Sequence, residues 1–286
     1  MKRGLILEGG GMRGMFTCGL LDVMMEHGLT VDALVGVSAG AAFGCNLKSH
    51  QPGRALRYNE WFAHDRRYAG LWSLLTTGDY YNARFCYHTV PTQYDPFDFK
   101  TFHADPMDFY VTCTDVDTGQ AVYHRCLPQD DAHRTLEWIR ASASMPVVAQ
   151  PVVIDGQRLL DGGMSDSIPL RWMQSQGCDR NVVVLTREAG YRKTPERLLP
   201  LIKWWMRRYP AVVKAMDSRA QFYNEQVAYV RQQEQIGHTL VFAPAGPLDV
   251  SRTTHSVDDM RRVYRQGRQQ ALERLDELKC FLAPND

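Results

Sequence analysis

A serine lies at the centre of a Gly-x-Ser-x-Gly pentapeptide, in which Ser38 has Gly36 and Gly40 on its two sides. In a tight turn between a strand and a helix, this spacing exposes the serine hydroxyl to a substrate carbonyl, and the small neighbours avoid clashes across the turn. The amides at the start of the following helix favour the negative charge of a tetrahedral intermediate. We therefore predict that Ser38 is the nucleophile of an acyl-transfer reaction.

A glycine-rich segment precedes this motif. Its residues are Gly9, Gly10, Gly11, Met12, Arg13 and Gly14. Amides without a neighbouring Cβ can approach an anion closely, as an oxyanion hole requires. We predict that this segment forms the oxyanion hole and that Arg13 adds positive charge or braces the loop. The segment also matches the Gly-x-Gly-x-x-Gly dinucleotide fingerprint, but the second predicted strand ends in Gly36-Val37-Ser38 and lacks the acidic residue which that fingerprint needs.

The third motif is Asp161, which two glycines follow, Gly162 and Gly163. A serine hydroxyl is a poor nucleophile unless a base removes its proton. An aspartate can be that base if it contacts the hydroxyl and is partly desolvated, because desolvation raises its pKa. The glycines would let this turn come close to Ser38. For an isolated Asp-Gly-Gly, an ordinary hairpin turn would be the better interpretation, so the assignment depends on the other two motifs.

The elements that position these motifs are predicted by apolar runs. Residues 4–7 and 31–37 are apolar and end at the glycine-rich segment and at the serine motif. Helical spacing over 12–27 and small residues over 39–47 predict that a helix follows each of these strands. Two successive strand–turn–helix units indicate a parallel sheet with helices packed on it.

The rest of the chain extends this α/β pattern. We predict hairpins over 109–124 and 151–160, a helix over 131–144, a core strand over 181–186, and helices and loops over one sheet edge for 52–106. Later segments predict helices over 194–235 and 256–282 and a strand over 239–242. The change in composition near residue 190 predicts a catalytic domain over 1–190 and a mainly helical C-terminal extension over 191–286.

Composition narrows the class of protein. The chain has 286 residues, is 44% hydrophobic and 23% charged, and carries a formal net charge of +1. This charge gives no global attraction to nucleic acid or to an anionic membrane. The seven cysteines are odd in number and include no Cys-x-x-Cys, so a disulfide framework or zinc site is not expected and a reducing cytosol is favoured.

The N-terminal apolar run stops at Glu8, too early for a signal peptide. No segment approaches the ~20 apolar residues that a membrane-spanning helix needs. We predict a cytoplasmic protein that contacts membranes peripherally at most. We expect a lipid or other acyl-ester substrate, no metal, no cofactor and no nucleic-acid partner, and the oligomeric state stays open.

These motifs, in this order, resemble the patatin-like phospholipase family. The matching segments are 8–14, 36–40 and 161–163, supported by Ala-Ser-Ala-Ser-Met-Pro over 141–146 and Ser-Ile-Pro over 167–169. The resemblance covers roughly residues 1–175 and implies a layered α/β/α fold with a mostly parallel central sheet.

For activity, the resemblance implies a Ser–Asp dyad without a catalytic histidine, which hydrolyses acyl esters of phospholipids and other lipids through an acyl-serine intermediate. Carried over, Ser38 is the nucleophile and Asp161 is the base. The amides of 9–11 form the oxyanion hole, with Arg13 at its edge. The implied class is a carboxylic ester hydrolase of the phospholipase A, lysophospholipase or lipase type.

Two other functions stay open. A Ser-Asp-His esterase could recruit His238 or His255, which follow Asp161 in the chain. A catalytically silent lipid-binding protein could keep the fold without turnover. The aromatic and cationic run over 204–209 suits a lipid interface, although such residues more often pack onto a core.

Overall fold

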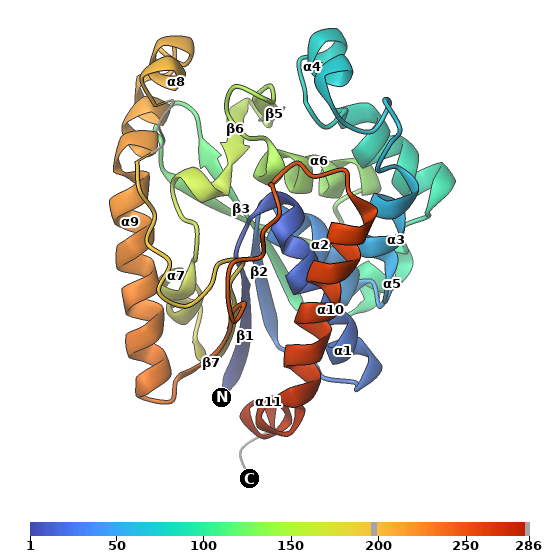
Figure 1. Cartoon of the computed structure of the whole chain (residues 1–286), viewed down its shortest axis with the longest axis vertical. Coiled ribbons are helices and arrows are strands. Elements are labelled where there is room, and N and C mark those ends of the chain that lie inside the picture. The colour runs from blue at the N-terminus through green and yellow to red at the C-terminus, as the bar shows by residue number, and fades with distance from the viewer. Residues whose placement is uncertain (196–198, 284–286) are drawn as a thin grey trace.

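The computed structural model describes residues 1–195 and 199–283, within which eight strands form one sheet (Figure 1). The sheet order is β5-β6-β3-β2-β1-β7-β8, and β4 also pairs with β3. Pairings among β1, β2, β3, β7 and β8 are parallel, and those of β4, β5 and β6 are antiparallel. The strands are β1 Lys2–Leu7, β2 Ala33–Val37, β3 Asp108–Asp115, β4 Ala121–Cys126, β5 Val152–Ile154, β6 Gln157–Asp161, β7 Cys178–Val184 and β8 Thr239–Phe242.

Helices cover both faces of the sheet, with α1, α2 and α10 on one side and α7 and α9 on the other (Figure 1). The helical segments are η1 Gly11–Gly14, α1 Met15–Glu26, α2 Ala39–Lys48, α3 Arg54–Trp61, α4 Leu71–Thr77, η2 Phe85–Tyr94, α5 Phe99–Ala104, α6 Ala132–Ala143, η3 Gly162–Met164, α7 Leu170–Ser175, α8 Leu199–Trp205, α9 Pro210–Gln235, α10 Val257–Glu273 and α11 Leu275–Leu282. The predicted α/β/α fold with a mostly parallel sheet is confirmed.

Residue alternation in the central strand explains the two layers. Leu5 and Leu7 of β1 belong to the core beneath α1 and α10, whereas Ile6 belongs to the core beneath α7 and α9. Successive side chains of a strand point to opposite faces, so a central strand covered on both sides must be apolar at every position. All three side chains are fully buried.

Three predicted segments differ in detail. The helices of 52–106 pack mainly against α1, α2, α6 and α10 rather than over a sheet edge. The predicted helix over 194–235 is divided into α8 and α9, because Pro210 restricts the preceding residue to extended geometry and begins a new helix. Residues 196–198 of that segment lie outside the described residues.

The third difference is the predicted helix over 256–282, which breaks at Arg274 into α10 and α11. The Arg274 guanidinium donates a hydrogen bond to the carbonyl oxygen of Val241 at 2.7 Å and lies over the Phe242 ring. These contacts fix the junction between α10 and α11 against β8.

The C-terminal segment contributes to the same sheet and helical layer as the rest of the chain. Strand β8 pairs in parallel with β7, and α10 packs along α1. The predicted division at residue 190 stays a prediction. Across 1–195 and 199–283, none of the helices is both long enough and apolar enough to span a membrane.

Candidate active site

Strands β2 and β6 share one edge of β3, end to end. The pairing of β2 with β3 finishes with Val37 opposite Thr112, and the next residue of β3, Cys113, pairs with Asp161 of β6. The other edge of β3 is occupied by β4. Because β2 runs parallel to β3 and β6 runs antiparallel, their carboxyl ends meet. Ser38, the residue after β2, therefore lies beside Asp161, the last residue of β6.

Ser38 occupies a strained turn between β2 and α2. Its φ of 55° and ψ of −121° are rarely adopted by a residue with a side chain, and such strain concentrates at functional sites. A Cβ at Gly36 would lie 2.5 Å from the backbone of Ala41, and one at Gly40 would overlap the carbonyl oxygen of Leu7. The two flanking glycines are thus required by the close approach of α2 to β2 and β1.

The end of α6 holds both members of the Ser38–Asp161 pair, which the sequence interpretation missed. Ser142 Oγ accepts a hydrogen bond from the Ser38 amide at 2.8 Å and donates one to the carbonyl oxygen of Thr112 at 2.6 Å. The carbonyl oxygen of Ser144 accepts a hydrogen bond from the Asp161 amide at 2.8 Å. The only signal in the sequence is the small-residue run before Pro146, which does not reveal these partners.

The Asp161 carboxylate is buried and lies beside Ser38 in the same hollow. Its Oδ1 accepts a hydrogen bond from the Gly163 amide at 2.7 Å. Burial raises the pKa of Asp161 above its ordinary range, and the polar Ser38 side chain and the positive charge of Arg219 oppose that rise only in part. A desolvated carboxylate in contact with a hydroxyl can accept its proton.

The glycine-rich loop lies directly against Ser38. A Cβ at Gly9 would lie 2.8 Å from Ser38 Cβ, and one at Gly10 would lie 2.6 Å from Thr186 Oγ1. Gly11 has a φ of 58°, and a Cβ there would overlap the carbonyl oxygen of Arg252. The loop can be this close only because it lacks side chains.

Some residues of the predicted oxyanion hole have other partners. The Met12 amide donates to the carbonyl oxygen of Arg252 at 3.0 Å, and the Arg13 amide donates to that of Gly10 at 3.3 Å. Gly14 lets η1 pack on the ring of Phe43 in α2. The amides of Met12 and Arg13 therefore have other acceptors, and the predicted role of amide donors to an oxyanion is left to residues 9–11.

Two hollows of different character meet at Ser38. The larger, the apolar hollow, is lined mainly by apolar side chains and lies beneath η2, α3 and α6. Its lining includes Phe43, Tyr58, Val90, Phe97, Leu136 and Ile139. The smaller, the polar hollow, lies between the glycine-rich loop and α9. Its lining includes Glu8, Asp161 and five cationic side chains: Arg13, Arg187, Lys193, Arg219 and Arg252. An ester with an apolar acyl part and a polar alcohol part fits this division.

The histidines of the alternative triad contact other groups. The two ring nitrogens of His255 interact with the carbonyl oxygen of Ala63 at 2.6 Å and the hydroxyl of Tyr80 at 3.1 Å. His238 is exposed in the loop that leads into β8. The geometry therefore brings neither imidazole to Asp161.

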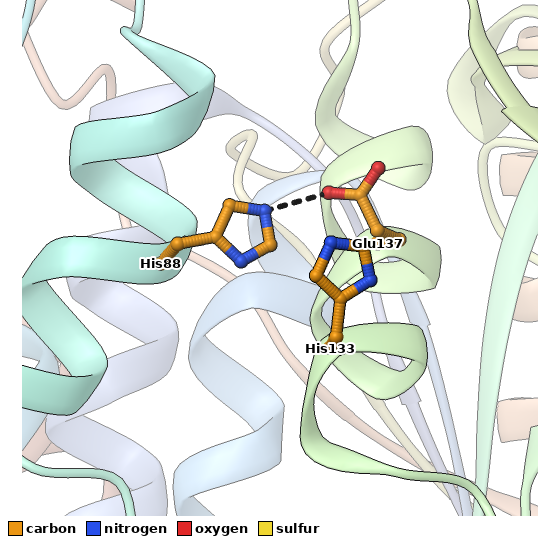
Figure 2. Close-up of side chains that lie close together, drawn as sticks. All are labelled: His88, His133 and Glu137. Atoms are coloured by element: carbon orange, nitrogen blue, oxygen red, sulfur yellow. Dashed lines mark hydrogen bonds and ion pairs between the residues drawn. The ribbon is translucent and has the colours of Figure 1, made fainter.

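One cluster of side chains has the composition of a metal site. His88 of η2 and His133 and Glu137 of α6 place their ligand atoms within 4.8 Å of one another (Figure 2). Glu137 accepts hydrogen bonds from His88 Nε2 at 2.9 Å and from Arg140 at 2.9 and 2.6 Å. Burial would raise the pKa of Glu137, but these hydrogen bonds outweigh it and lower the pKa to about 2. Because both carboxylate oxygens are engaged, this cluster joins η2 to α6 as an ion-pair network, and the expected absence of a metal stays a prediction.

The comparisons with known proteins define the family. The family model described as patatin-like phospholipase matches residues 5–172, which is more than half of the chain. The chain belongs to the patatin-like phospholipase family. A second family model, described as a domain of unknown function, matches residues 209–283.

The individual relatives share less than a third of their residues with this chain over the aligned segments. The uncharacterized protein YjjU of Escherichia coli is 28% identical over 215 residues, which span 70% of this chain and 56% of that protein. Lysophospholipase NTE1 of Chaetomium globosum is 28% identical over 62% of this chain but only 11% of its own length. The chain thus spans about half of the first relative and about a tenth of the second. The crystal structure of VipD from Legionella pneumophila has a TM-score of 0.50, covers 96% of this chain and 67% of that chain, and at 13% identity shows the fold alone.

Proposed function

We propose that this chain is a serine acyl-ester hydrolase acting on lipids, with Ser38 as nucleophile and Asp161 as proton acceptor. One observation carries the proposal. Ser38 lies beside the buried carboxylate of Asp161 at the point where an apolar hollow and a polar hollow meet, because β2 and β6 end together at one edge of β3. Membership of the patatin-like phospholipase family supports a lipid ester as substrate.

In the proposed reaction, Ser38 Oγ attacks the carbonyl carbon of the ester while Asp161 accepts the hydroxyl proton. The carbonyl oxygen becomes an anion that the amides of residues 9–11 stabilise. The C–O bond to the alcohol then breaks, and the alcohol leaves with the proton from Asp161. Water next gives a proton to Asp161 and attacks the acyl-serine, which releases the fatty acid and returns the proton to Ser38.

We also propose that the site meets its substrate at a lipid surface. Trp204 and Trp205 of α8 are each 59% exposed, so the expectation that this run packs onto a core is wrong for both. Trp72 of α4 is 63% exposed, beside exposed Leu71 and Leu75. Figure 1 shows α4 and α8 at the same end of the molecule, beyond the carboxyl ends of the parallel strands. Exposed aromatic and aliphatic side chains at one end suit the boundary of a lipid layer.

The test is hydrolysis of a lysophospholipid by the full chain and by two variants, Ser38→Ala and Asp161→Asn. We expect both variants to lose nearly all turnover while their circular dichroism and melting temperatures stay close to those of the parent. Ser175→Ala is the matched control, because the hydroxyl of this exposed serine of α7 bonds only to close neighbours in the chain, the carbonyl oxygen of Trp172 and the side chain of Gln176. Turnover near the parent's in either dyad variant would refute the assignment, and a parent without turnover would favour the silent lipid-binding protein.

A further inference from the structure

Helix α9 places Arg219 beside the turn that carries the proposed base. Met216 of α9 is buried in one apolar cluster with Leu160 and Met164, which lie just before and shortly after Asp161 in the chain. Arg219 comes about one helical turn after Met216, and residues at this spacing share one face of a helix. The half-buried Arg219 side chain therefore faces the Asp161 turn.

The Arg219 guanidinium is connected to the Asp161 carboxylate through Gly163. Arg219 Nε donates a hydrogen bond to the carbonyl oxygen of Gly163 at 2.6 Å, and the Gly163 amide donates one to Asp161 Oδ1 at 2.7 Å. A Cβ at Gly163 would lie 3.1 Å from Asp161 Oδ1 and 3.4 Å from Arg219 Nη2. The guanidinium can thus act on the carboxylate both through the backbone of the turn and through its charge.

The proposed reaction needs an ionised Asp161, and Arg219 favours that state. Burial raises the pKa of this carboxyl, and among the cations Arg219 opposes the rise most strongly, with a weaker effect from Arg252. The other titratable groups around Asp161 are Glu8 after β1, Arg13 of η1, Tyr87 of η2, Cys113 of β3, and Arg187 and Lys193 in the loop after β7. Arg219 combines the strongest cationic effect with a hydrogen bond to the turn itself.

The same helix also contacts the start of the glycine-rich loop. Tyr223, one helical turn beyond Arg219, donates a hydrogen bond from its hydroxyl to the Glu8 carboxylate at 2.9 Å. The other carboxylate oxygen of Glu8 accepts one from the Thr186 amide at 2.6 Å. Helix α9 therefore contacts both loops that the proposed reaction uses.

We propose that Arg219 is a positioning residue of the active site, which orients the Asp161 turn and supplies the counter-charge that the buried carboxylate needs. The inference rests on the proposed function. It gives a role to α9, which begins the segment 209–283 that matches the family model of unknown function. Turnover then depends on a side chain from the C-terminal segment as well as on the three motifs of the N-terminal half.

The first test is the pH dependence of kcat/KM for an uncharged, soluble short-chain ester, measured with the full chain. Arg219→Gln and Arg219→Met remove the charge, and the apolar stem of methionine fills much of the same space, whereas Arg219→Lys keeps the charge. We expect the pH below which kcat/KM falls to rise by about one pH unit in the Gln and Met variants, because a nearby cation lowers the pKa of a carboxyl by about that much or more. The Lys variant should keep the parent's midpoint.

Arg231→Gln is the matched control for this profile. Arg231 also belongs to α9 and is similarly half-buried, but it pairs with Glu234 on its own helix at 2.7 Å. Its variant should reproduce the parent's profile. A loss of rate by the same factor at every pH in Arg219→Gln and Arg219→Met would indicate a merely structural role and overturn the proposal, as would an equal rise of the midpoint in Arg219→Lys.

The second test does not require turnover. Carboxyl ¹³C NMR of the chain with labelled aspartate follows the protonation of Asp161, whose signal is identified by its absence from the spectrum of Asp161→Asn. We expect the titration midpoint to be about one pH unit higher in Arg219→Gln than in the parent and in Arg231→Gln. Equal midpoints would overturn the inference. A parent without turnover would defeat the proposed function, while the midpoints would still decide whether Arg219 supplies the counter-charge.

Discussion

Replacement of Ser142 by alanine tests whether α6 positions the nucleophile. Ser142 Oγ joins the Ser38 amide at 2.8 Å to the carbonyl oxygen of Thr112 at 2.6 Å, and all three groups are buried. Alanine would remove both hydrogen bonds and leave a buried donor and a buried acceptor without partners. Each such loss costs about 1–3 kcal/mol. We therefore expect Ser142→Ala to lower the free energy of unfolding by about 2–4 kcal/mol, since the two losses partly overlap.

The same substitution should reduce catalysis more than binding. Without its anchor, the strained backbone of Ser38 can relax, so the hydroxyl shifts away from Asp161 and kcat falls by ~10-fold or more while KM changes little. The assays are urea unfolding followed by circular dichroism, and steady-state hydrolysis of a soluble short-chain ester. Ser49→Ala is the control, because this buried serine ends α2 and bonds only to a carbonyl oxygen of its own helix. Parent-like stability and kcat in Ser142→Ala would refute the anchoring role.

Further predictions concern the base, the turn, the histidines and the surface. Because burial raises the pKa of Asp161, kcat/KM should fall as pH decreases through a value above that of an ordinary aspartate, since the protonated carboxyl cannot accept a proton; a flat profile down to pH ~4 would contradict this. Gly40→Ala should cost about 1–3 kcal/mol because its methyl overlaps the Leu7 carbonyl oxygen, whereas Gly246→Ala, with open space around it, should melt like the parent. A double variant, His238→Ala with His255→Ala, should keep most of the ester turnover. Loss of turnover without unfolding would instead support the Ser-Asp-His triad. The double variant Trp72→Glu with Trp205→Glu should reduce flotation with phosphatidylcholine vesicles. The control Ile236→Glu, at an exposed position at the end of α9, should not. Equal flotation of the parent, the double variant and the control would refute a lipid-binding end.

Features set by neighbouring residues were predictable from the sequence. The apolar runs before residues 9 and 38 predict β1 and β2, and the glycines that follow predict turns, because strand and turn preferences act over a few residues. The approach of Asp161 to Ser38 was inferred from the chemistry that the motifs need and from the family resemblance, not from local structural preference. Its physical cause is the shared edge of β3, a long-range pairing that local patterns do not specify.

Features set by distant contacts were not predictable. Ser142 looks like any small helical residue until its contacts with Ser38 and Thr112 are known. The charge in the polar hollow comes from segments as far apart as η1 and the loop after β7, so no single window of sequence reveals it. The break at Arg274 has no glycine or proline to signal it and depends on a carbonyl group of β8.

The most direct test of the central claim is the reaction of the full chain with a fluorophosphonate, followed by peptide mass spectrometry. The proposed pairing of Ser38 with the buried Asp161 carboxylate predicts a single covalent adduct on Ser38, formed at least ~10²-fold more slowly in Asp161→Asn. An adduct on another serine, or an equal labelling rate in the Asp161→Asn chain, would contradict the account.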